Sequence, residues 1–235
     1  MGWRLTPSVG ASNTIYANGS DRGGRTDRNS ASSTRRVCFL MAKSQSWWSA
    51  GVDFDFKLLE RFHDGIRTAQ GKTDNDAVAH MKKWEASWGE VPSEIYDWGA
   101  DERSWARDAA RVMYAGLAVA VASLAENTLA HVNRRKGVVY LDKKGKLISR
   151  PDWGIHRQAF ENRFNVKLDS FTGYPSVHRA RLLANSFKHR DGKRNAADCA
   201  VIGGRVGSEI EYEGQPWDRM LRGTRTFLKR VVSRR

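Results

Sequence analysis

Apolar residues recur at helical spacing in the chain beyond residue 50. Residues 53–70 carry apolar side chains three or four positions apart, which predicts an amphipathic helix with an inner face of Phe54, Leu58, Leu59, Phe62 and Ile66. Asp74 is a suitable N-cap for a second helix that runs to Ser87. The inner face of this second helix is predicted to be Ala77, Val78, Met81 and Trp84.

A longer helix is predicted from Asp101 to about Arg135, where Gly137 supplies a stop signal. The middle of this helix is apolar on nearly every side, which is typical of the central helix of a bundle. Three more helices follow: they cover about 155–165, the stretch from the turn at Gly173 to Arg190, and Trp217 to about Val232.

Two short segments have the pattern of β-hairpins. Residues 138–141 and 147–149 flank a polar turn that contains Gly145. Residues 199–213 alternate apolar residues with glycines and predict a second hairpin. The pattern as a whole therefore predicts a mainly α-helical bundle with two small β-hairpins.

The first forty residues differ in composition from the rest. Residues 1–40 are rich in Ser, Gly, Asn, Thr and Arg and show no apolar periodicity, so they bury too little surface to order themselves. We expect residues 1–40 to be a disordered or extraneous tail and residues 41–235 to form a single domain. Met41 lies at this boundary, and a chain that began there would have an ordinary globular composition.

The net charge of +14 is concentrated at the two ends of the chain. Residues 1–40 carry +4, residues 41–175 carry +2, and residues 176–235 carry +8. A basic surface attracts phosphate backbones, which makes nucleic acid one interpretation of the last segment. The alternative is a solvated helix face that aids solubility.

The remaining composition argues against several classes of protein. Two cysteines are too few for a disulfide framework or an all-cysteine zinc site, and no histidine pair has metalloprotease spacing, so we expect no metal and no cofactor. No run of 18 apolar residues and no secretory signal occurs. We therefore expect a cytoplasmic protein that does not bind membranes. The nine tryptophans are interpreted as core residues, with base stacking as the alternative.

The most informative stretch is 176–191. Ala180, Leu183, Ala184 and Phe187 follow the three-four pattern of an inner helix face. A different side of the same helix carries two imidazoles, a guanidinium and an amide at intervals of three, four and four residues: His178, Arg181, Asn185 and His189. Lys188 and Arg190 lie nearby. Such a surface is suited to a phosphodiester.

These residue types permit cleavage of RNA without a metal. His189 is the candidate general base or acid for a ribose 2′-hydroxyl, because imidazole titrates near neutral pH. Arg181 or Lys188 would stabilise charge on the phosphorus, and Asn185 would orient the imidazole or a phosphate oxygen. The alternative is structural: a histidine at a helix end often faces solvent or caps the backbone, and an asparagine often bonds to a neighbouring helix.

The stretch 182–192 resembles the signature helix of the HEPN superfamily, whose motif is an arginine, a polar residue, three further residues and a histidine. Asn185 and His189 match the polar and histidine positions, and Ala184 occupies the arginine position. The run 113–132, with Glu126 near its end, resembles another helix of this superfamily. The resemblance spans about residues 101–192. It implies a helical bundle, a homodimer that combines two motifs, and RNA cleavage in toxin–antitoxin or phage-defence systems, with an antitoxin as partner.

Three functions remain open at this point. The first is RNA binding with metal-independent endoribonuclease activity. In this function Arg181 or Lys188 supplies the positive charge that is missing at the arginine position of the motif, where this chain has Ala184. The second is a non-catalytic dimerisation or interaction module. The third is a DNA-binding accessory protein that uses the basic last helix, where Arg222, Arg225 and Lys229 join Lys188 and Arg190 as candidate nucleic-acid-binding residues.

Overall fold

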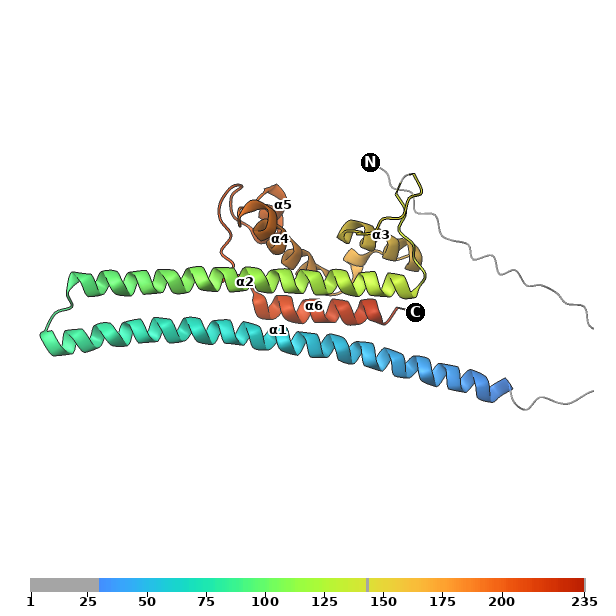
Figure 1. Ribbon diagram of the computed structural model, residues 1–235, viewed down its shortest axis with the longest axis horizontal. Helices are drawn as coiled ribbons and strands as arrows, with labels where there is room; N and C mark the ends of the chain where they lie inside the picture. The colour runs from blue at the N-terminus through green and yellow to red at the C-terminus, as the bar shows by residue number, and fades with distance from the viewer. Residues whose placement is uncertain (1–29, 143, 235) are drawn as a thin grey trace, which may run out of the picture.

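The protein is mainly α-helical. The computed structural model describes residues 30–142 and 144–234, with side chains from residue 50 onward. Its helices are α1 (Ser30–Trp88), α2 (Ser93–Arg135), α3 (Trp153–Phe164), the short 3-10 helix η1 (Leu168–Ser170), α4 (Tyr174–Arg190), α5 (Ala196–Ile202) and α6 (Trp217–Val232). Figure 1 shows α1 and α2 as a long antiparallel hairpin that packs with α6, while α3, α4 and α5 lie on the other side of α2.

Helix α1 is one continuous helix, although the sequence predicts two. The stretch between the predicted helices remains helical, and Asp74 does not begin a new one. The reason is tertiary packing, since a single apolar seam continues along α1 from Val52 through Phe56 and Ile66 to Ala77. Burial of such a seam stabilises a helix more than local start signals do.

The predicted inner face of α1 is largely wrong. Phe54, Leu58 and Phe62 are 63%, 48% and 46% exposed, whereas Ile66 is buried as predicted and Leu59 is partly buried. The residues that face the core instead include Phe56 and the polar His63. A prediction that counts only apolar residues places the inner face on the Phe54 side of the helix, because the side that is buried includes the polar His63.

Helix α2 is the centre of the bundle, as its apolar middle predicts. It begins at Ser93 rather than Asp101 and ends at Arg135, as expected. Its buried residues include Ala118, Val121 and Leu129, and it packs against α1, α3, α4 and α6. Tyr114 stacks on Trp217 of α6 with 5.3 Å between the ring centroids.

Among the described helices, α2 is also long and apolar enough to cross a membrane by length and composition alone. That property is weak evidence, because the core helix of a water-soluble bundle passes the same test. The buried residues of α2 pack against four neighbouring helices, which accounts for part of its apolar composition.

Neither predicted β-hairpin forms a named strand in the described residues. The first region has a single antiparallel bridge between Leu141 and Leu147, closed by a turn in which the Asp142 side chain accepts hydrogen bonds from two backbone N–H groups. The second prediction is wrong over 199–202, which belong to α5, because Asn195 and Asp198 form a capping box that starts a helix there. A single bridge joins Lys193 to Glu209.

The predicted domain boundary at residue 40 does not coincide with the end of an element. Residues 30–40 of the expected tail are the first turns of α1, and residues 1–29 lie outside the described part. The prediction of a single domain from residue 41 onward stays a prediction.

Asp53 joins α1 to α6. Its carboxylate lies 2.6 Å from Arg225 and 2.8 Å from Lys229. The hydrogen bond from Lys229 is the largest cause that lowers the pKa of Asp53 from 3.8; burial opposes it, and the hydrogen bond and charge of Arg225 and the charge of Lys229 add to it. The ionised form therefore stabilises the fold above pH 3.8, and this contribution is lost as the pH falls through the folded-state pKa.

Asp53→Asn is expected to lower the free energy of unfolding by about 1 kcal/mol at pH 7, since the group is partly exposed. The loss should shrink when urea denaturation is repeated below pH 3.8, because the wild-type carboxylate takes up a proton as the pH falls through its lowered folded-state pKa. Asp55→Asn is the matched control, because Asp55 is exposed and has no ion pair in the described residues. An equal loss for Asp53→Asn at both pH values would contradict the pairing.

Candidate functional site

Helix α4 is positioned by its apolar side and by both of its ends. Gly173, with a positive φ of 89°, precedes the helix, and Pro175 occupies its first turn. At the other end Asp191 adopts a left-handed conformation, and the N–H of Gly192 donates to the carbonyl of Ser186. The side toward the core is formed by Val177, Ala180, Leu183, Ala184 and Ser186. Phe187, which the sequence places inward, is 40% exposed.

The four residues His178, Arg181, Asn185 and His189 share another side of α4, which we call the α4 face. The first three are half-buried and His189 is exposed. Asn185 and His189 are one turn apart, about 6 Å along the axis, whereas Arg181 lies about 12 Å from His189. The helix therefore brings together neighbouring pairs of this face, but it does not bring Arg181 to His189 within one chain.

The side chains of Asn185 and His189 have no polar partner within the protein's described residues. Neither side chain has a hydrogen bond or ion pair with any other residue that the structure describes. The last turn of α4 also carries Lys188 and Arg190. The positive charge of Lys188 offsets the negative partial charge of the helix C-terminus, whereas the charge of Arg190 is paired with Asp198.

Arg181 is held against an aromatic ring. Its guanidinium lies over the ring of Trp153, the first residue of α3, at 4.4 Å from the centroid. Burial lowers the pKa of Arg181 from its usual 12.5, although the nearby Tyr174 and Glu126 act in the opposite direction. A guanidinium in this environment stays charged and is pre-positioned by stacking.

His178 is a second imidazole of the α4 face with unused hydrogen-bonding capacity. Its ring stacks on that of Tyr174 with 6.0 Å between the ring centroids. Its Nδ1 atom is buried and has no hydrogen-bond partner in the described residues. Burial lowers the pKa of His178 below 6.5, and the charges of Arg181 and Arg157 lower it further. The imidazole is therefore neutral at pH 7.

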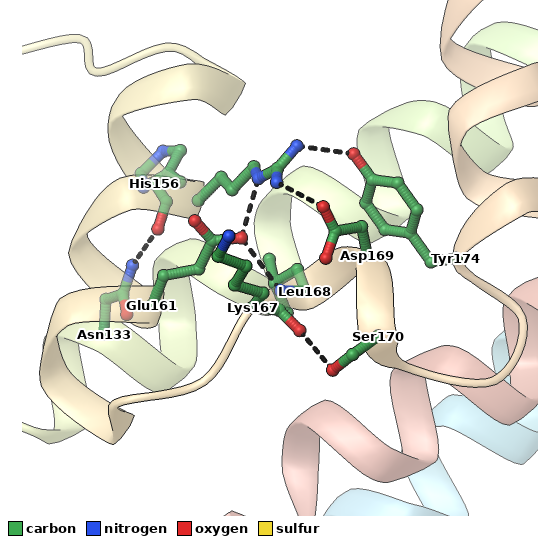
Figure 2. Close-up of polar contacts among 9 residues, drawn as sticks. Asn133, His156, Glu161, Lys167, Leu168, Asp169, Ser170 and Tyr174 are labelled. Carbon is green, nitrogen blue, oxygen red and sulfur yellow. Dashed lines mark hydrogen bonds and ion pairs between the residues drawn. The ribbon is translucent and has the colours of Figure 1, made fainter.

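A network centred on Arg157 connects α3, η1 and α4. The Arg157 guanidinium donates to the hydroxyl of Tyr174 at 2.7 Å, to Glu161 at 2.8 Å and to Asp169 at 3.3 Å. Glu161 also accepts from the backbone N–H of Leu168 (Figure 2). These contacts fix Tyr174, on which His178 stacks, and so they position the first part of the α4 face.

The candidate cations differ in their surroundings. Arg190 is paired with buried Asp198 at 2.7 Å, and Arg225 and Lys229 are both held by Asp53. Lys188 and Arg222 are exposed and have no ion pair in the part of the chain that is described. Of the five residues named as nucleic-acid contacts, three therefore bind carboxylates of the protein itself.

Ala184, at the arginine position of the motif, is 2% exposed. It lies on the core side of α4 beside Leu183 and Ala180, so the position does not belong to the α4 face. Arg181 on the α4 face and Lys188 beside it have no ion pair with the described residues.

The sequence reasoning missed three residues around the α4 face: Trp153, Arg157 and Tyr174. The four-residue spacing of Arg157 and Glu161 signals an ion pair on α3. No local pattern indicates that this arginine reaches Tyr174, 17 residues further along the chain. Asp152 as the N-cap of α3 would have placed Trp153 in the first turn.

No group of three or more His, Cys, Asp or Glu side chains within 30–142 and 144–234 is arranged to hold a metal ion. Comparison with known proteins finds no family model, no curated protein and no solved structure that matches this chain.

Proposed function

We propose that the protein binds single-stranded RNA along the α4 face and cleaves it without a metal ion. The observation that supports this proposal is the α4 face itself. It presents a stacked guanidinium, a free amide and two imidazoles on one side of one helix. From His178 to His189 it extends about 16 Å, enough for two or three nucleotides of an extended strand.

In the proposed reaction the 2′-oxygen of a ribose bonds to the adjacent phosphorus, and the bond from phosphorus to the 5′-oxygen breaks. His189 takes the proton of the 2′-hydroxyl, and Asn185 orients the imidazole or a phosphate oxygen. Arg181 stabilises the charge that develops on the phosphoryl oxygens. The products are a 2′,3′-cyclic phosphate and a 5′-hydroxyl.

The proposed site needs two copies of the chain. Arg181 lies about 12 Å along α4 from His189, too far for both to serve one phosphate within a chain. A homodimer that apposes two α4 faces in antiparallel orientation brings Arg181 of one copy to His189 of the other. The protonated His189 returns its proton to the departing 5′-oxygen through a water molecule. We propose, from the resemblance of residues 182–192 to the HEPN signature helix, a HEPN-like, cytoplasmic homodimer of a toxin or phage-defence system, with an antitoxin as its partner.

A non-catalytic interaction module is the second candidate function. The observation that favours it is buried Ala184, which leaves the motif without its arginine. The DNA-binding alternative has less support, because Asp53 pairs with both Arg225 and Lys229 of the basic last helix. Of its three named cations, only Arg222 is unpaired in the described residues.

RNA cleavage in EDTA tests the proposal. The full chain should cut a labelled single-stranded RNA, and His189→Ala should reduce the rate at least about a hundredfold, the lower end of what an acid–base group contributes. His80→Ala is the matched control, since His80 is also exposed but lies on α1. Far-UV circular dichroism should be the same for all three proteins.

Absence of cleavage by the wild-type chain, with RNA still bound, would support the non-catalytic alternative. Equal rates for wild type and His189→Ala would show that the cleavage does not use the α4 face.

A further inference from the structure

Helix α2 carries two seams of residues on opposite sides. The buried seam includes Gly99, Ala110 and Leu117. On the far side, Trp98, Trp105 and Val112 recur every seven residues and are 45%, 75% and 59% exposed. Large apolar side chains exposed at regular intervals are unusual for a helix surface and are typical of a protein contact.

Small residues alternate with the large ones on this side. Ala109 and Gly116 each follow a large residue by four positions, and both are exposed. A Cβ atom added at Gly116 would have no atom of the described residues within 4 Å. We call Trp98, Trp105, Ala109, Val112 and Gly116 the outer seam. The alternation of three and four residues, large with small, is the pattern into which the side chains of a second helix pack.

The outer seam has an acidic border. Glu94, Asp101 and Asp108 recur every seven residues along one side of it, and all three are exposed. None of them has an ion pair in the described residues. This border is notable in a chain whose net charge is +14. In paired helices, charges at such bordering positions select the partner and its orientation.

We propose that the outer seam binds a basic amphipathic helix of a partner protein. The apolar stripe provides the contact, and the three carboxylates select lysine or arginine on the adjoining side of the partner. From Trp98 to Gly116 the seam is about 27 Å long, so it accommodates about five turns of helix. Antiparallel pairing with α2 of a second copy is disfavoured, because it would place two acidic borders side by side.

The location of the outer seam makes it accessible. The half of the α1–α2 hairpin that contains Trp98 and Trp105 extends beyond α3, α4 and α6 (Figure 1). The ring of His80 in α1 lies beside the ring of Trp98, with 5.1 Å between the ring centroids. Trp105 is three-quarters exposed. The side chains of the outer seam are therefore accessible to a partner helix. This proposal is independent of the proposed RNA chemistry.

The test uses two synthetic helical peptides of about 20 residues with the same leucine stripe. One peptide has lysine and the other glutamate at the positions that border the stripe. Fluorescence anisotropy with the full chain should show the lysine peptide binding at least about tenfold more tightly than the glutamate peptide. Trp105→Ala should weaken the binding of the lysine peptide at least about tenfold.

Reversing the charge of the acidic border tests whether these carboxylates select the peptide. In the double variant Asp101→Lys with Asp108→Lys the preference should reverse, so that the glutamate peptide binds more tightly. Asp74→Lys with Asp76→Lys is the matched control, because these carboxylates are exposed on α1 and unpaired in the described residues, and it should keep the wild-type preference.

Three results would overturn the proposal. The first is that neither peptide binds, or that both bind equally. The second is sedimentation that shows a dimer of the wild-type chain which Trp105→Ala dissociates, because the occupant would then be a second copy. The third is pelleting with phosphatidylcholine vesicles that depends on Trp105, because the occupant would then be a lipid surface.

Discussion

Asp198→Ala is expected to lower the free energy of unfolding by about 3 kcal/mol, as is typical when one partner of a buried ion pair is removed. Asp198 is fully buried, and one of its oxygens accepts hydrogen bonds from Ser186, Arg190 and the backbone N–H of Asn195. Alanine would remove the acceptor that these three donors share, would leave the positive charge of Arg190 without its carboxylate, and would also remove the capping box of α5. Urea denaturation monitored by tryptophan fluorescence measures the change.

Glu213→Ala is the control for Asp198→Ala. Glu213 is an exposed carboxylate in the same part of the chain with no ion pair in the described residues. Its removal should change stability by less than about 0.5 kcal/mol. If the two variants lost equal stability, the network that ties the end of α4 to α5 would not contribute as the contacts indicate.

Gly173→Ala is also expected to cost about 3 kcal/mol, from a left-handed backbone penalty and an overpacking penalty together. Gly173 has a φ of +89°, and a Cβ there would overlap the carbonyl oxygen of Gly223 and lie 3.1 Å from the backbone nitrogen of Phe227. The atoms in the way are backbone atoms of α6, which cannot rotate aside. Thermal and urea unfolding should both show the loss.

Gly137→Ala separates the two contributions. Gly137 also has a positive φ, +68°, but a Cβ there would have no atom of the described residues within 4 Å. Only the backbone penalty remains, so the expected loss is about 1 kcal/mol. Equal losses for Gly173→Ala and Gly137→Ala would mean that α4 and α6 do not approach as closely as the structure indicates.

The ends of α4 and α6 could be predicted because their signals are local. Helix α6 begins at Trp217 and ends at Val232, as its flanking Pro216 and its apolar period indicate. Helix α4 ends at Arg190, two residues before Gly192. These signals act within one turn of the chain, where sequence neighbours are also neighbours in space.

The face of α1 that turns inward could not be predicted in the same way. The choice between the Phe54 stripe and the Phe56 stripe depends on where α2 and α6 lie, and Asp53 fixes α6 on one side through Arg225. The buried His63 also makes the Phe56 stripe look less hydrophobic in the sequence than it is in the fold. Tertiary contacts therefore decided what the helical period left open.

In the candidate site too, features within one helix could be predicted and contacts between separate elements could not. The alignment of His178, Arg181, Asn185 and His189 follows from helical spacing alone, and α4 is a continuous helix over all four. The stacking of Arg181 on Trp153 and the link from Arg157 to Tyr174 join separate elements, and no spacing rule predicts them. The pairing of Arg225 and Lys229 with Asp53 crosses more than 170 residues of chain, and so charge counting overstated the basic surface of α6.

The most direct measurement of the central claim is a histidine side-chain NMR titration with RNA. The chain would carry ¹⁵N-labelled histidines, and the ligand would be a single-stranded oligonucleotide with 2′-O-methyl groups, which cannot be cleaved through the 2′-oxygen. RNA on the α4 face should shift the imidazole resonances of His189 and His178 and leave those of His80, on the distant part of α1, unchanged. Saturating RNA that leaves His189 and His178 unshifted would contradict the claim.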